Sequence, residues 1–154
     1  MTTRGIECLK QAGVRFEILP YCHEAKGAKP VAEALGLPEE IVIKTLVFRA
    51  DDGSFLLALM DGNGNVREKK LARASGHKRV SPAAPRDAER VTGFQIGGIG
   101  PFGLKQPLPV LLDETTAQHD EIVINAGARG TMIRIATRDL LRLTGARIVD
   151  IRVE

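Results

Sequence analysis

Two features of this 154-residue chain have residue types and spacing that could do chemistry. The first is a glycine-rich segment over residues 97–103, with the sequence Gly-Gly-Ile-Gly-Pro-Phe-Gly. Glycine lets a backbone approach a ligand closely, and proline stiffens one point of such a loop. Free N–H groups along the loop could hold a carbonyl or an anionic oxygen. The alternative is a structural loop whose turns need glycine, and the spacing alone favours neither interpretation.

The second feature is Lys44, which interrupts an apolar and β-branched run over residues 41–50. Strand alternation puts Lys44 on the same face as Val42, Leu46 and Phe48, and the opposite face is apolar as well. Such a strand is expected at the centre of a sheet, where an unpaired ammonium is costly to bury. The sequence therefore predicts either a cation at the floor of a pocket or an edge lysine that reaches water. An ammonium facing glycine amides would suit acyl transfer or ester hydrolysis.

Other catalytic constellations are weakly supported. The chain has no Gly-x-Ser-x-Gly motif and its three histidines are scattered, so no Ser-His-Asp triad is predicted. Cys22 and His23 are adjacent, but neighbours on a strand point to opposite faces, which argues against a Cys–His pair. His119 has no second histidine at ligand spacing. We therefore expect neither a metal nor another cofactor.

The composition predicts one globular domain over residues 1–154, since 44% of the residues are apolar and 27% are charged. Aromatic residues make up only 4%, which argues against a base-stacking platform. The net charge of +3 is compatible with a polyanionic partner. Cys8 and Cys22 lack CxxC spacing and are expected to be free thiols. Because no signal-like segment follows Met1 and no apolar run suits a bilayer, a cytoplasmic protein without membrane contact is predicted.

The elements that position these groups are predicted to be short. Helices are expected over residues 3–12, 30–35, 67–75, 83–92 and 138–143, and strands over residues 14–20, 41–50, 54–60, 108–112, 121–125, 131–136 and 147–153. Thr137 is expected to cap the last helix. Strict β-α-β alternation is missing. The pattern therefore predicts an α+β fold in which a mixed or antiparallel sheet curls toward a barrel, with short helices around it.

Short motifs are spread over nearly the whole chain. They are Tyr21-Cys22-His23-Glu24, Lys44-Thr45-Leu46-Val47, Lys69-Lys70-Leu71-Ala72, Thr92-Gly93-Phe94, the loop over residues 97–103, Leu108-Pro109-Val110, Asn125-Ala126-Gly127 with Arg129-Gly130, Asp139-Leu140-Leu141, and Thr144-Gly145-Ala146. In this order they resemble the YbaK/EbsC family, the free-standing relatives of the editing domain of bacterial prolyl-tRNA synthetases. The resemblance is far more specific than any single motif.

The resemblance implies hydrolysis, in trans, of an amino acid wrongly esterified to tRNA. The implied partners are tRNA, above all the acceptor end of tRNA-Pro, and prolyl-tRNA synthetase. It assigns catalysis to Lys44 and to a loop that positions the aminoacyl carbonyl and the terminal adenosine, formed by Gly97, Gly98, Ile99, Gly100 and Pro101. Substrate contacts are expected from Tyr21, Thr45, Phe102, Gly103, Gly127 and Met132.

Two positions depart from the family pattern. Gly100 stands where many members have a serine before the loop proline, and Met132 stands where cysteine-specific members have an aspartate. Cys-tRNA(Pro), Ala-tRNA(Pro) and tRNA charged with another small residue therefore all stay open as substrates, and so do attack by water and by the thiol of a cysteinyl substrate. The alternatives are a non-catalytic tRNA or nucleic-acid-binding module of the same fold and a hydrolase of small free esters.

Phosphate contacts would come from two basic sets. The first contains Arg67, Lys69, Lys70, Arg73, Lys78 and Arg79, and the second contains Arg129, Arg134, Arg138, Arg142 and Arg147. A solvated helix face is the alternative explanation for such runs. Steep salt dependence of binding would distinguish the two interpretations.

Overall fold

The computed structural model describes residues 2–22, 24–25 and 27–154. Met1, and His23 of the Cys22–His23 pair, lie outside the described residues. In the described part of the chain, no helix is long and apolar enough to cross a membrane.

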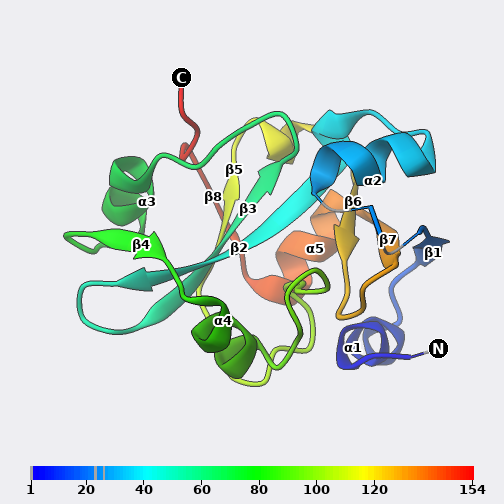
Figure 1. Ribbon diagram of the computed structural model, residues 1–154, viewed down its shortest axis with the longest axis horizontal. Coiled ribbons are helices and arrows are strands. Elements are labelled where there is room, and N and C mark those ends of the chain that lie inside the picture. Colours follow the sequence, from blue (N-terminus) through cyan, green and yellow to red (C-terminus); the bar gives the residue numbers. More distant parts are fainter. Residues whose placement is uncertain (1, 23, 26) are drawn as a thin grey trace.

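One mixed sheet forms the centre of the protein (Figure 1). The strands found in the described residues are β1 (Phe16–Pro20), β2 (Val42–Ala50), β3 (Phe55–Asp61), β4 (Val80–Pro82), β5 (Val110–Asp113), β6 (Glu121–Asn125), β7 (Thr131–Ala136) and β8 (Arg147–Val149). Their order in the sheet is β1-β7-β6-β2-β3-β5-β8, and β4 pairs with β2. Antiparallel hairpins are combined with parallel β2–β6, β3–β5 and β5–β8 pairs. The predicted α+β class and mixed sheet are confirmed, and the sheet stays open at β1 and β8.

Short helices cover both faces of this sheet. They are α1 (Arg4–Ala12), α2 (Ala28–Leu35), α3 (Glu68–Ser75), α4 (Pro85–Thr92) and α5 (Thr137–Thr144), with single 3₁₀ turns at η1 (Glu39–Ile41) and η2 (Thr116–Gln118). Helices α1, α4 and α5 contribute to the largest apolar core, whereas α3 and α2 each cover a smaller cluster. In Figure 1 the helices surround the sheet, and the chain ends near α3.

Strand β2 distributes its side chains among these three clusters. Ile43 and Val47 point into the largest core. On the opposite face, Val42 belongs to the cluster under α2 and Phe48 to the cluster under α3. Lys44 lies on that second face, at the break between the two smaller clusters. The predicted central strand is therefore confirmed, and its lysine occupies a position that neither cluster fills.

Three details differ from the sequence prediction. Strand β4 was not predicted, because a three-residue strand ending at Pro82 carries no usable periodicity. The turn η2 was also not predicted. Thr137 is the first residue of α5, and the cap position is Ala136. The hydroxyl of Thr137 donates to the carbonyl of His119 instead of capping the helix. The predicted Thr137 cap is therefore wrong, since a tertiary acceptor lies within reach of that hydroxyl.

Candidate functional site

A gap in the sheet beside β2 creates the candidate site. Strand β6 pairs with β2 only at Val42 and Ile43, and β4 pairs with it only from Phe48 to Ala50. Residues 44–47 therefore have β3 on one side and no strand on the other. A cavity of about 620 Å³ lies at this gap. Its volume is in the range of small-molecule and cofactor pockets.

The cavity brings together half of the residues predicted for the site. Lys44, Gly97 and Ile99 line it, and so do Tyr21, Thr45 and Met132. The remaining wall comes mainly from apolar residues of α2 and β2, from Pro82, Ala83 and Ala88, and from Ile96, Asn125 and Arg129. Lys44 and the glycine loop, which are about fifty residues apart in the sequence, therefore face one cavity.

The ammonium of Lys44 is half-buried and has a defined partner. Its Nζ donates a hydrogen bond of 2.7 Å to the carbonyl oxygen of Gly64. Burial lowers the pKa of Lys44 below its ordinary value; Asp61 and Glu39 partly counter this, and the positive charge of Arg152 adds to the lowering. An ammonium has three donors, so the bond to Gly64 leaves two that can serve a ligand.

Thr45, which lines the same cavity, has unsatisfied polar groups. Its Oγ1 is buried and has no hydrogen-bond partner among the described residues. Backbone direction alternates along β2, and the carbonyl of Val47 accepts from the N–H of Ala83 on the side away from β3. The N–H and C=O of Thr45 therefore point to that same side, where the sheet is interrupted. Buried polar groups of this kind are rare in native proteins and usually indicate a ligand or water site.

The glycine loop packs on the hairpin between β6 and β7. The N–H of Gly98 donates to Gln95, and its carbonyl accepts from Gly127, so both groups are used inside the protein. A Cβ on Gly100 would lie 2.7 Å from the carbonyl carbon of Asn125. Close approach to the hairpin is therefore one physical reason for these glycines.

Gly97 and Ile99 are the loop residues that line the cavity. In the described part of the chain, no acceptor is found for the N–H of either residue. Gly97 has φ +94°, a left-handed conformation that favours glycine, and a Cβ on it would lie 3.1 Å from Arg129 Nε. Among the loop residues that line the cavity, these two N–H groups could therefore serve a ligand.

The other predicted site residues lie behind the wall. Pro101 is buried, and Phe102 is part of the largest core with 1% exposure. Gly103 packs against the backbone of Arg4, and Gly127 packs against the ring of Phe94. None of these four lines the cavity, nor do Gly98 and Gly100. Their contacts support the loop and the hairpin that carry the lining residues.

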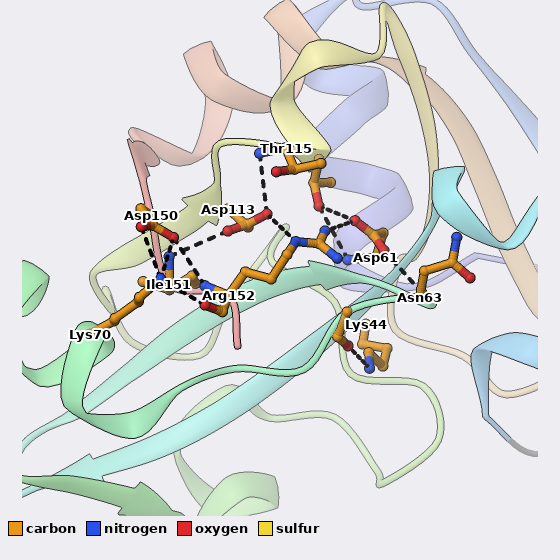
Figure 2. Close-up of polar contacts among 11 residues, drawn as sticks. Lys44, Asp61, Asn63, Lys70, Asp113, Thr115, Asp150, Ile151 and Arg152 are labelled. Atoms are coloured by element: carbon orange, nitrogen blue, oxygen red, sulfur yellow. Dashed lines mark hydrogen bonds and ion pairs between the residues drawn. The ribbon is translucent and has the colours of Figure 1, made fainter. Parts of the chain in front are cut away.

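Two features were not predicted as parts of a site. Arg129 lies at the cavity, and its Nε donates to the carbonyl of Ile96 at 2.6 Å. The available signals were its place in the Asn-Ala-Gly-x-Arg-Gly motif and in the second basic set predicted for phosphate contacts. The second feature is a buried network behind Lys44, in which Arg152 contacts both Asp61 and Asp113 (Figure 2). No local pattern marks it, because its members come from separate parts of the chain.

Comparison with known proteins shows the same fold and the same domain. The family model described as aminoacyl-tRNA editing domain matches residues 22–143. A crystal structure with an attributed trans-editing role for prolyl-tRNA synthetase superimposes with a TM-score of 0.89 and 28% identity, covering 100% of this chain and 99% of that one. The fold and the cavity therefore define an aminoacyl-tRNA editing domain.

Sequence relatives refine this assignment. EbsC of Enterococcus faecalis, to which Cys-tRNA(Pro)/Cys-tRNA(Cys) deacylase activity is attributed, is 37% identical over 124 residues, which are 80% of this chain and 76% of EbsC. The proline–tRNA ligase of Trichlorobacter lovleyi is 34% identical over 119 residues, 76% of this chain but only 21% of the ligase. The chain belongs to the aminoacyl-tRNA editing family, and the resemblance to YbaK/EbsC proteins is confirmed. Its class of function is that of an editing deacylase.

Proposed function

We propose that this protein acts in trans on mischarged tRNA and hydrolyses the ester that joins a small amino acid, cysteine or alanine, to the terminal ribose of tRNA-Pro. In this role it would safeguard translation fidelity in the cytoplasm, beside prolyl-tRNA synthetase. The observation that carries the proposal is the shared cavity. Lys44, Thr45, Gly97 and Ile99 line one space that is large enough for an aminoacylated nucleoside, and each keeps a donor without a partner among the described residues.

The proposed chemistry needs no strong nucleophile, because an aminoacyl ester is already activated. The ester carbonyl lies between the Lys44 ammonium and the N–H groups of Gly97 and Ile99, which stabilise the negative charge that develops on its oxygen. Water attacks the carbonyl carbon, the bond to the ribose oxygen breaks, and that oxygen leaves with a proton. With a cysteinyl ester, the thiol of the substrate attacks instead and releases a thiolactone.

The apolar end of the cavity supports a small side chain on the substrate. Val31, Val42 and Met132 belong to the cluster under α2, and all three line the cavity. Met132 is buried, with 3% exposure, and brings no charge to this end. An apolar wall of this kind fits the methyl of alanine at least as well as the thiol of cysteine. A polar side chain would be left without a partner there.

The tRNA body needs cations outside the cavity, and part of the predicted basic sets is already engaged. Lys70 forms ion pairs with Asp150 and Glu154, and Arg142 forms one with Asp139. Arg147 donates a hydrogen bond to the carbonyl of Ala74. Besides Arg147, seven members of the two sets have no acidic partner among the described residues: Arg67, Lys69, Arg73, Lys78, Arg79, Arg129 and Arg138. We propose that phosphate contacts come from these residues.

The proposal is tested with tRNA-Pro charged separately with cysteine, alanine, serine and proline. We expect release of cysteine or alanine at least tenfold faster than release of proline, with no comparable turnover of free amino-acid esters. Binding of the charged tRNA should weaken steeply between 50 and 200 mM salt, since each phosphate contact releases counterions. Binding without release of any amino acid would favour the non-catalytic module. Equal turnover of free esters would favour a general esterase.

A further inference from the structure

The proposed mechanism leaves unused a charged network behind Lys44. Asp61 and Asp113 are buried, with 2% and 0% exposure. The Nε of Arg152 contacts Asp113 Oδ2 at 3.1 Å, and the other arm of the guanidinium contacts Asp61 (Figure 2). Two buried carboxylates therefore share one guanidinium. Such an arrangement is costly to assemble and strongly destabilised when one partner is removed.

Gly64 connects this network to Lys44. Its carbonyl accepts the Lys44 hydrogen bond. A Cβ on Gly64 would lie 2.6 Å from Arg152 Cζ and 2.6 Å from Met60 Sδ, so the guanidinium packs directly against Gly64. The Gly64 carbonyl and the Arg152 guanidinium are therefore fixed relative to each other.

The chain around Arg152 is held on both sides of this contact. The N–H of Arg67 donates to the carbonyl of Ile151, and the N–H of Val153 donates to that of Asn65, each at 2.8 Å. Residues 151–153 therefore run as a strap along residues 65–67. The strap lies beyond residues 22–143, which the family model matches.

Asp61 is the acidic group whose charge acts most strongly on Lys44. Its negative charge is the largest of those that raise the pKa of Lys44. In the structure, the Asp61 carboxylate already accepts from Arg152, from the hydroxyl of Thr116 at 2.8 Å and from the N–H of Asn63 at 2.9 Å. A carboxylate binds an ammonium more strongly than a neutral carbonyl does. Loss of Arg152 would therefore strengthen the attraction of the Asp61 carboxylate for the Lys44 ammonium.

We propose that Arg152 is a positioning residue for Lys44: it occupies Asp61 and supports Gly64, and so keeps the Lys44 ammonium on the Gly64 carbonyl, available to the cavity. The inference rests on the proposed function only for the consequence in catalysis. The placement of Lys44 itself can be measured without substrate.

The first test is the titration of Lys44 in the free protein. The side-chain Cε and Nζ signals of labelled lysine are followed by NMR, and the Lys44 signal is assigned by its loss in Lys44→Met. The charged groups that influence Lys44 are Asp61 from β3, Glu39 from η1 and Arg152 from the strap. Arg152→Gln removes a positive charge and frees Asp61, so the Lys44 midpoint should rise by about half a pH unit or more. An unchanged midpoint would overturn the proposal.

The second test uses the double variant Asp61→Asn with Arg152→Gln. Arg152→Gln alone should lower kcat for deacylation about tenfold, with a small change in KM. In the double variant the competing carboxylate is gone, so kcat should recover to within about threefold of Asp61→Asn alone. A merely structural role would give no recovery, because both substitutions damage the same network. If Arg152→Gln does not fold, the comparison between Asp61→Asn and the double variant is the test. A kcat of the double variant more than tenfold below that of Asp61→Asn would contradict the proposal.

A matched control is Arg90→Gln, which removes an exposed guanidinium paired with Asp87 on the surface of α4. It should change neither the Lys44 midpoint nor kcat. Failure of the proposed function would look different, since wild type would then release no amino acid while the Lys44 midpoint still responded to Arg152→Gln.

Discussion

The two sides of Lys44 differ in how completely their polar groups are paired. Behind it, Asp61, Asp113 and Thr116 are buried, and every one of them has a hydrogen-bond partner. On the cavity side, Thr45 Oγ1 and the N–H groups of Gly97 and Ile99 lack partners among the described residues. Buried polar groups cost free energy unless they are paired. The paired side fixes geometry, and the unpaired side is where the protein can gain free energy by binding a substrate.

Lys44→Ala should produce the largest effect on activity. Loss of one donor to a developing oxyanion typically costs about 10²–10³ in rate, and we expect a fall in single-turnover deacylation of at least that size. Lys44→Met is the shape-matched control and should be equally inactive. Deacylation at the wild-type rate by either variant would remove Lys44 from the mechanism.

The same variants should leave the fold intact. Because burial lowers the pKa of Lys44, the folded protein favours the neutral form, so the protonated lysine lowers stability below its folded-state pKa. That penalty disappears as the pH rises above the ordinary lysine pKa. At pH 7, Lys44→Met should therefore unfold at a urea concentration no lower than wild type. A clear loss of stability would mean that Lys44 has a structural role.

Two glycines of the loop should differ in stability. Gly100→Ala puts a methyl against the backbone of Asn125, which cannot move without displacing the hairpin, and should cost about 2–4 kcal/mol. Gly97→Ala meets only the flexible Arg129 side chain and should cost about 1 kcal/mol, from its positive φ. Urea unfolding measures both. Equal losses in the free energy of unfolding would contradict the distinction between Gly97, which lines the cavity, and Gly100, which supports the loop from behind.

Threonine-to-valine substitutions compare the two sides directly. Thr116→Val removes a hydroxyl that bonds Asp61 twice and should cost about 1–3 kcal/mol. Thr45→Val removes an unpartnered hydroxyl, so the free energy of unfolding should stay equal or rise, while deacylation slows several-fold. If Thr45→Val destabilises the protein as much as Thr116→Val does, the Thr45 hydroxyl on the cavity side must have a hydrogen-bond partner, and the contrast between the two sides fails.

The smallest effect should come from Lys70→Gln, which removes the ion pairs of Lys70 with Asp150 and Glu154 and its hydrogen bond to the carbonyl of Arg152. Surface ion pairs contribute little because water and salt screen them. We expect the unfolding midpoint and the deacylation rate to match wild type within error, in contrast to Arg152→Gln. A loss of activity equal to that of Arg152→Gln would show that the strap acts through its surface contacts rather than through the buried guanidinium.

Local pattern was enough to find the strand and the loop. Alternation in residues 41–50 identified a strand apolar on both faces, and Lys44 was conspicuous because an ammonium is costly in such a place. The glycine loop was identified from composition, and the order of the short motifs identified the family. These features depend on neighbouring residues, and the sequence therefore contains them directly.

The sequence alone determined the α+β class, the central strand and its anomalous lysine, because periodicity and residue chemistry are local properties. Only the tertiary structure decided which groups share the cavity. The gap beside β2 depends on where β4 and β6 stop pairing, and Arg152 meets Asp61 and Asp113 from 91 and 39 residues away. Contacts of that separation follow from how the whole chain packs, and no stretch of neighbouring residues encodes them.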